Sequence, residues 1–243
     1  MQYQSSRGNS PSVTAAQAII NGIAPDGGLY IPDKIPSLSK EDFINWIDLP
    51  YQGRAQTVLQ QYLTDFSPAE VSDCIKAAYN QRNFDSAQIA PLIELSPRLH
   101  MLELWHGPTS AFKDMALQIL PHLLTTSMKK TGENNQIVIL VATSGDTGKA
   151  ALEGFRDVAG TQIVVFYPAQ GVSQVQRLQM VTQAGENVNV AGVTGNFDDA
   201  QNGVKKIFGD QDFIGRLAGN NLKMSSANSI NWGRLLPQIV YYL

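Results

Sequence analysis

Apolar residues in the second half of the chain alternate between short β-rich runs and segments with helical spacing. The runs at 137–142 and 162–167 are typical of strands buried in a parallel sheet, and 187–190 is a weaker third. Helical spacing follows each run, at 150–155, 173–183 and 198–208. This alternation predicts an α/β fold with a mostly parallel sheet.

The first 92 residues have a different pattern. Prolines at positions 11, 25, 32, 36, 50 and 68 interrupt short periodic segments, so small helices joined by turns are expected. Apolar spacing predicts helices at 14–21, 59–63 and 70–79, with a turn and short strand at 24–32. We therefore expect a mostly helical domain over 1–92 and an α/β domain over 93–243.

Composition narrows the function without identifying it. The 243 residues are 43% hydrophobic and carry a formal net charge of -3. A net negative charge provides no positive electrostatic field that would attract nucleic acid or an anionic membrane. The single cysteine, Cys74, excludes an internal disulfide and a cysteine-rich metal site, and we expect it to be buried. No run approaches a membrane span, and the first residues lack the apolar segment of a signal peptide. A soluble, cytoplasmic protein without a metal is expected.

Lys113 is the most informative single residue. It lies next to the end of the segment LELWHGPTSAFKD, Leu102–Asp114, in which apolar side chains and a Gly-Pro turn precede it. Most lysines are solvated surface charges, but exclusion of water disfavours the charged amine and favours its use as a nucleophile. His106 could titrate near neutrality, although a structural hydrogen bond is the simpler interpretation. Asp114 is expected near the start of a helix at 115–124.

A glycine-containing turn, Thr143–Gly148 (TSGDTG), separates a predicted strand from a predicted helix. Its hydroxyls and the amides at a helix N-terminus favour a bound carboxylate or phosphate. Simple helix capping is the alternative. A P-loop is excluded because Thr143 replaces the first glycine and Ala150 the required serine or threonine.

A third polar cluster spans Ser226–Arg234, before a helix predicted at 235–243. Asn228, Ser229, Asn231 and Arg234 can converge on one anion if the chain turns there. Arginine is permanently charged and suited to a bidentate phosphate contact. A surface arginine at a helix start is the alternative.

These motifs together resemble the threonine synthase family. Supporting stretches are Gly171–Met180 (GVSQVQRLQM), Gly195–Gln201, Tyr3–Gly8 and Gly22–Pro32. The resemblance implies an N-terminal domain of the threonine synthase type, then part of a three-layer parallel-sheet domain of the fold type II that binds pyridoxal 5'-phosphate (PLP). It makes Lys113 the Schiff-base lysine and places Phe112 and Asp146 beside the cofactor.

The implied activity is conversion of O-phosphohomoserine and water to threonine and phosphate, by a carbon–oxygen lyase in the last step of threonine biosynthesis. By resemblance Ser144, Gly145 and Thr147 would bind the substrate's carboxylate region. Ser229, Asn231 and Arg234, helped by Thr147, would bind its phosphate. Related enzymes often have asparagine at the position of Asp146, so an aspartate there must be protonated or paired.

Two alternatives remain at this stage: a threonine-synthase-like phospho-lyase, and a non-catalytic module of the same fold. The family's glycine-rich loop for the PLP phosphate does not occur among the 243 residues. We therefore expect these residues alone to bind PLP poorly and to be inactive. The family includes monomers and homodimers, and the sequence does not distinguish them.

Overall fold

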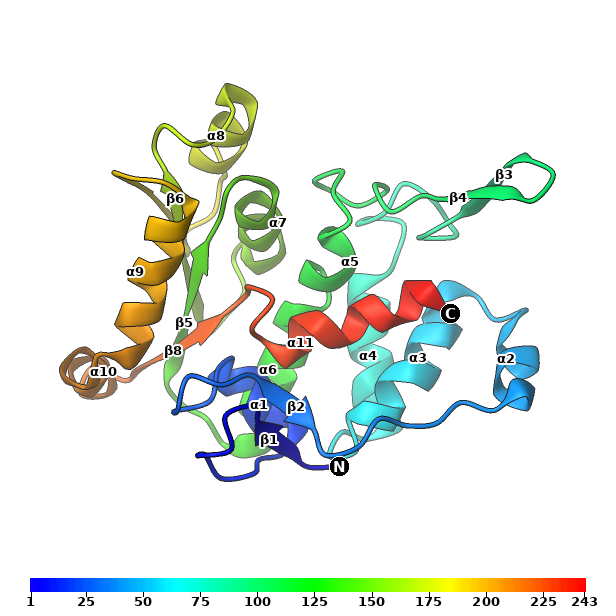
Figure 1. Ribbon diagram of the computed structural model, residues 1–243, viewed down its shortest axis with the longest axis horizontal. Coiled ribbons are helices and arrows are strands. Elements are labelled where there is room, and N and C mark those ends of the chain that lie inside the picture. Colours follow the sequence, from blue (N-terminus) through cyan, green and yellow to red (C-terminus); the bar gives the residue numbers. More distant parts are fainter.

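Four parallel strands form the central sheet of the computed structural model, which describes residues 1–243 (Figure 1). The strands are β5 (Gln136–Ala142), β6 (Thr161–Pro168), β7 (Val188–Val193) and β8 (Leu222–Ser226), in the spatial order β7-β6-β5-β8. In this register Ile139 of β5 pairs with Ile163 of β6 and with Ser225 of β8. The predicted α/β class is confirmed. Strand β8 was not predicted, because LKMSS lacks an apolar run.

Helices cover both faces of this sheet. Helix α7 (Asp146–Phe155) packs on one face, and α9 (Phe197–Gly209), followed by α10 (Gln211–Ala218), packs on the other (Figure 1). Alternate residues of β5 serve the two layers: Ile139 and Val141 join the main core, whereas Leu140 and Ala142 join a small core beneath α9. Helix α8 (Gln174–Val181) follows β6 and packs against α7.

The first third of the chain is mostly helical, as the proline spacing predicted. Its elements are β1 (Tyr3–Ser5), α1 (Ala15–Asn21), β2 (Tyr30–Pro32), α2 (Lys40–Trp46), α3 (Tyr51–Tyr62) and α4 (Pro68–Ala78). Thr14, Ser39 and Ser67 each cap a helix through a reciprocal capping box, which explains why these short helices begin where they do. Strands β1 and β2 pair antiparallel.

Two predicted helices are interrupted, in each case near a proline. The helix predicted at 115–124 is divided into α5 (Asp114–Leu117) and α6 (Leu120–Thr131), with Pro121 in the first turn of α6. The helix predicted at 235–243 is instead α11 (Trp232–Leu235) followed by a 3-10 helix, η1 (Leu236–Tyr242), with Pro237 in its first turn. Proline has no N–H to donate to the preceding turn, so the α-helical hydrogen bonding stops there.

One hydrophobic core joins the N-terminal third to the rest of the chain. The rings of Tyr3 and Trp232 lie 5.4 Å apart, and the Tyr79 hydroxyl donates to the Met115 carbonyl at 2.6 Å. Cys74 is buried, as expected, with 2% of its surface exposed. The division at residue 92 stays a prediction. None of the helices combines the length and apolar character that a membrane-spanning helix requires.

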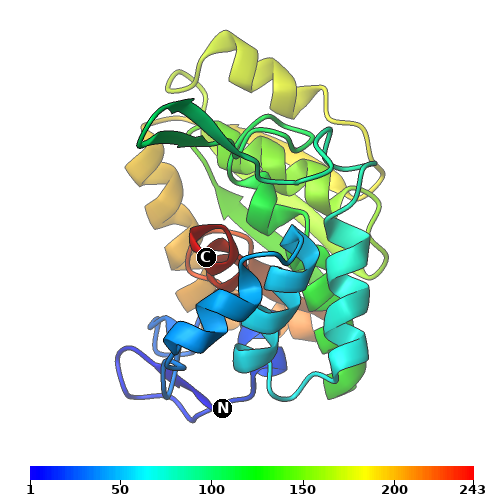
Figure 2. The same ribbon diagram turned by 90° about the vertical axis from the view of Figure 1, so that its right-hand side faces the viewer.

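A hairpin of β3 (Leu92–Ser96) and β4 (Leu99–Leu102) extends away from this core (Figure 1 and Figure 2). Its apolar side chains are exposed: Leu92, Ile93, Leu95, Leu99 and Met101. The chain leaving β4 leads to the loop that carries Lys113.

Candidate active site

Lys113 lies immediately before α5, at the edge of a cavity of about 440 Å³. Its Nζ is 3.2 Å from Oδ2 of Asp146 and 4.5 Å from the centre of the Phe112 ring, and 19% of its side chain is exposed. Leu102, Leu104 and Trp105 also line the cavity. The apolar surroundings expected from the sequence are present, but the amine also has a carboxylate partner from a distant part of the chain.

Asp146 is held from two sides at the first turn of α7. Its Oδ1 accepts a hydrogen bond from Nε2 of Gln176 at 2.8 Å, while Oδ2 faces Lys113. The hydrogen bond from Gln176, and then the contact with Lys113, lower the pKa of Asp146 against the opposing effect of partial burial. Of the two states that the sequence left open, the structure shows the paired one.

The turn between β5 and α7 is organised from within by Thr143. Its buried Oγ1 accepts hydrogen bonds from the amides of Gly145 at 3.0 Å and Gly148 at 2.9 Å. Gly145 has a φ of 150°, which an L side chain rarely adopts. The result is a tight turn in which Ser144 is exposed and Thr147 half-buried, so that both are accessible at the end of the sheet.

Arg234 is a buried cation that the protein itself does not neutralise. The residue is 4% exposed and forms no salt bridge; Nη1 donates to the Ala227 carbonyl at 2.6 Å and Nη2 lies 3.5 Å from Thr147 Oγ1. Its Nε is buried without a partner. Burial lowers the pKa of Arg234 to about 10. Such a group favours a bound anion.

A cavity of about 370 Å³ lies beside this arginine. Its lining includes Ser144, Thr147, Asn228, Ser229 and Arg234. The structure thus brings together two segments that are more than 75 residues apart, the turn after β5 and the turn after β8. The same turn contributes to both cavities: Ser144 and Thr147 line the cavity beside Arg234, whereas Asp146 lines the cavity beside Lys113.

Asn231 does not line the cavity beside Arg234, although the sequence predicted that it would contact the substrate's phosphate. Its side chain is fully buried, donates to the carbonyls of Ile19 and Ser226, and accepts from the Gly233 amide. All of its amide groups therefore have protein partners, and it fixes the start of α11 rather than facing the cavity. Asn228 faces the cavity but also bonds the backbone of Ala142 through both of its amide atoms.

The two other candidates in the lysine segment hold the loop in shape. The ring of His106 lies between Asp85, at 2.6 Å, and Glu103, at 2.8 Å. Both contacts raise the pKa of His106, that with Glu103 most. Asp114 is fully buried and accepts from the amide and hydroxyl of Thr109 at 2.8 and 2.7 Å.

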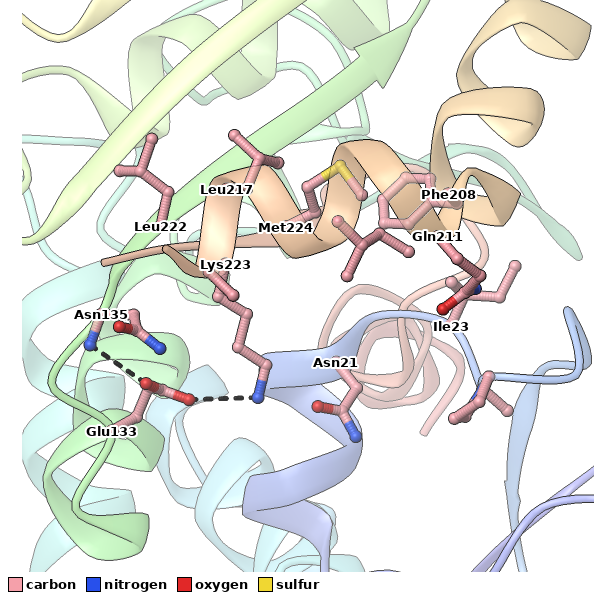
Figure 3. Close-up of a pocket in the computed structure, with 14 residues that line it drawn as sticks. Asn21, Ile23, Glu133, Asn135, Phe208, Gln211, Leu217, Leu222, Lys223 and Met224 are labelled. Carbon is pink, nitrogen blue, oxygen red and sulfur yellow. Dashed lines mark hydrogen bonds and ion pairs between the residues drawn. The ribbon is translucent and has the colours of Figure 1, made fainter. Parts of the chain in front are cut away.

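A separate cavity of about 460 Å³ lies at the opposite end of the sheet, by the first residues of β8 (Figure 3). It is largely apolar, and its charged residues, Glu133 and Lys223, pair with each other at 3.1 Å. Because Lys113 and Arg234 are near the carboxyl ends of the strands, this cavity is not part of their site.

Sequence reasoning missed Gln176, whose contact with Asp146 joins residues 30 positions apart. The only sequence signal was its place in the stretch Gly171–Met180. It also missed Phe197 and Gln201 of α9, which line the cavity beside Arg234.

The fold and this site define a class of protein: an α/β domain with a lysine and an anion site at the carboxyl ends of parallel strands, where such folds bind their ligands. Comparison with known proteins is more specific. The sequence model described as the threonine synthase N terminus matches residues 2–79. The chain is 40% identical to threonine synthase of Pseudomonas aeruginosa, covering 100% of this chain and 50% of that protein. It is 42% identical to human threonine synthase-like 1, over 93% of this chain and 31% of that protein.

The fold is shared as well. A crystal structure of PLP-bound threonine synthase from Brucella melitensis superposes with a TM-score of 0.85 at 37% identity, over 100% of this chain and 50% of that one. The chain belongs to the threonine synthase family, as its motifs predicted. It spans about half the length of the threonine synthases that it matches.

Proposed function

We propose that this chain provides the lysine and the phosphate-binding residues of a threonine synthase, which converts O-phosphohomoserine and water to threonine and phosphate with PLP. The observation that carries the proposal is the pairing of two groups around one turn. Lys113 lies on one side of residues 144–147 and the unneutralised Arg234 on the other. An amine that holds a cofactor and a cation that holds a leaving phosphate are the two groups this reaction requires.

The residues around Lys113 fit PLP. The cavity has room for a substituted pyridine ring, and Trp105 and Phe112 supply apolar surface beside the amine. Asp146 and Phe112 would contact the cofactor, and Lys113 would attach it covalently through Nζ. When bound, PLP supplies an electron sink that makes the α and β hydrogens of an attached amino acid acidic.

The residues of the chain would then have distinct tasks. Lys113 Nζ would move protons at the α, β and γ carbons of the substrate. Ser144, Gly145 and Thr147 would bind the carboxylate region from the turn before α7. Arg234 would hold the phosphate with Ser229 and Thr147, and its planar fork would orient the bond that breaks. Asn231 would act indirectly, by fixing the start of α11.

We further propose that the protein containing this chain works in the cytoplasm as a monomer or homodimer, with residues 1–92 as a domain of the threonine synthase N-terminal type and residues 93–243 as the first part of its PLP-dependent catalytic domain. The acidic sequence with a single buried cysteine supports this location.

The first test concerns the lysine and needs no turnover. The protein that contains this chain is incubated with PLP, reduced with borohydride, and mapped by peptide mass spectrometry. We expect the pyridoxyl group on Lys113 and its loss in Lys113→Ala. Lys149→Ala is the matched control, because Lys149 is also 19% exposed and also paired with a carboxylate, that of Glu153. Labelling spread evenly over surface lysines would contradict the proposal.

The second test concerns the reaction, in the protein that contains this chain. Phosphate and threonine are measured together after addition of O-phosphohomoserine. Equimolar products that disappear in Lys113→Ala would support the synthase. Phosphate accompanied by a keto acid would favour a phospho-lyase, which remains the second candidate because the chain matches proteins named threonine synthase-like as closely as named synthases. If the wild type releases neither threonine nor phosphate, a non-catalytic module would be favoured.

A further inference from the structure

Helix α8 begins with a capping box in which Gln176 has a fixed orientation. The Ser173 side chain accepts from the Gln176 amide at 3.2 Å, and Oε1 of Gln176 accepts from the amide and hydroxyl of Ser173 at 3.4 and 3.1 Å. A backbone N–H can only donate, so it identifies the atom facing it as the amide oxygen. The amide nitrogen of Gln176 therefore points away from its own helix.

That nitrogen reaches Asp146. Nε2 of Gln176 donates to Oδ1 at 2.8 Å, and the other oxygen of the carboxylate faces Lys113 at 3.2 Å. Gly145 makes this approach possible, because a Cβ there would overlap the amide of Gln176. The contact thus links three separate segments: the lysine loop, the turn after β5, and the start of α8.

We propose that Gln176 is a positioning residue of the Lys113 site, which holds the Asp146 carboxylate ionised and aimed at the amine that captures PLP. This inference rests on the proposed function for its cofactor and goes beyond it in assigning a role to the stretch Gly171–Met180. Because Gln176 occupies one oxygen of the Asp146 carboxylate, one oxygen is left, and that oxygen faces Nζ of Lys113.

The hydrogen bond from Gln176 to Asp146 becomes more important when the amine of Lys113 holds a cofactor. Lys113 is the charged side chain that acts on Asp146, and a neutral donor on α8 supplies the other side-chain contact. When the amine is occupied by a cofactor, its charge no longer holds the carboxylate. The amide of Gln176 keeps its hydrogen bond in both situations, because the backbone N–H of Ser173 fixes the orientation of its oxygen.

The test measures Asp146 directly in the unliganded chain. Aspartate labelled with ¹³C at Cγ is incorporated, the Asp146 resonance is assigned with Asp146→Asn, and its titration midpoint is measured by NMR. We expect Gln176→Leu to raise the midpoint by roughly half a unit to one unit, as loss of one donor to a carboxylate does. Gln176→Glu should raise it further, since it keeps the acceptor of the capping box but sets a second carboxylate against the first.

Ser173→Ala is the matched control. It weakens the cap of α8 but leaves the donor on Gln176, so the midpoint of Asp146 should stay near that of the wild type. The second readout is the PLP concentration that half-saturates borohydride trapping on Lys113. It should rise about fivefold in Gln176→Leu, the scale of one hydrogen bond near 1 kcal/mol, and remain unchanged in Ser173→Ala.

Three results would overturn the proposal: an unchanged midpoint in both Gln176 variants, an equal shift in Ser173→Ala, or a shifted midpoint without any change in trapping. Absence of trapping in the wild type of the protein that contains this chain would instead reject the proposed function. The NMR titration would still decide whether Gln176 holds Asp146, so the two failures are distinguishable.

Discussion

The guanidinium of Arg234 lies 3.5 Å from the hydroxyl of Thr147, and the contact joins residues 87 positions apart. With the Ala227 carbonyl, this hydroxyl is one of two neutral groups that hydrogen-bond a buried positive charge. A buried cation compensated only by dipoles is costly in the free protein and strongly favours an anion. Stability and ligand binding are therefore opposed at this residue.

Replacing Arg234 should separate these two effects. The low pKa of Arg234, about 10, corresponds to a cost of about 3 kcal/mol for burying its charge. Loss of the hydrogen bond to Ala227 offsets part of that gain, so Arg234→Met should raise the free energy of unfolding by about 1 to 2 kcal/mol. Urea unfolding of the unliganded chain measures this change.

The same variant should lose its response to phosphate. Inorganic phosphate should raise the melting temperature of the wild type but not that of Arg234→Met. Arg234→Lys keeps a charge without the planar fork, so it should respond more weakly than the wild type. An equal rise in all three proteins would show that phosphate binds elsewhere.

Sequence reasoning recovered the residues of this site that stand in local motifs. Lys113 and Arg234 are recognisable from their neighbours, whereas the contact of Gln176 with Asp146 depends on how α8 packs beside α7. Asn231 illustrates the opposite error: its place among polar residues favoured a ligand contact, but its partner Ile19 comes from a helix more than 200 residues away. Residue type indicates which hydrogen bonds a side chain can form. Only the fold shows whether those hydrogen bonds are already made within the protein.

The prediction of helices and strands from the sequence was limited in the same way. Strands β5 and β6 were predicted because helices cover both faces of the sheet at these strands. Both strands are therefore long runs of apolar residues that the sequence shows directly. Strand β8 lies at an edge of the sheet, where Lys223 reaches Glu133, and its mixed sequence has no such signal. The start of α7 was displaced because the turn held by Thr143 leads directly into it: the helix begins at Asp146, four residues before the predicted start at Ala150.

Asp114 should make the protein more stable in mild acid. Burial raises the pKa of Asp114 despite its bonds to Thr109, so the folded state binds this proton more tightly than the unfolded chain. From about pH 4 upward, the contribution of Asp114 to the free energy of unfolding therefore falls as the pH rises. Asp114→Asn should reduce the gain in stability between pH 7 and pH 5, measured by urea unfolding. A larger gain in the variant would contradict this.

His106 should act in the same pH direction for a different reason. Its contacts with Glu103 and Asp85 raise the pKa of the imidazole, so its contribution is fully present below about pH 6.5 and is lost as the pH rises through the raised value. His106→Gln should therefore destabilise the chain at pH 6, by about 0.5 to 1 kcal/mol, and less at pH 9. Equal losses at both pH values would argue against the paired imidazolium.

Gly22 should be the glycine at which the N-terminal helices are most sensitive to an added methyl group. It ends α1 with φ 70° and ψ -45°, and a Cβ there would lie 2.9 Å from the backbone nitrogen of Ser226 in β8. Gly132 ends α6 with a similar φ of 67° but a left-handed ψ of 27°, and nothing lies within 4 Å of its Cβ position. Alanine at Gly132 meets only the strain of the left-handed region, about 1 to 2 kcal/mol.

Gly22→Ala should therefore lower the free energy of unfolding by a further 1 to 3 kcal/mol, roughly the cost of forcing a close contact in a packed interior. The φ and ψ of Gly22 are unfavourable for alanine. The atom nearest to the added Cβ is the backbone nitrogen of Ser226, which cannot move away by a change of side-chain rotamer. Urea unfolding of the two single variants measures the difference. Because α1 packs against β8 here, Gly22→Ala should also shift the Ser229 and Arg234 turn and weaken the thermal response to phosphate. Equal losses of stability in the two variants would show that α1 can move away from β8 without cost.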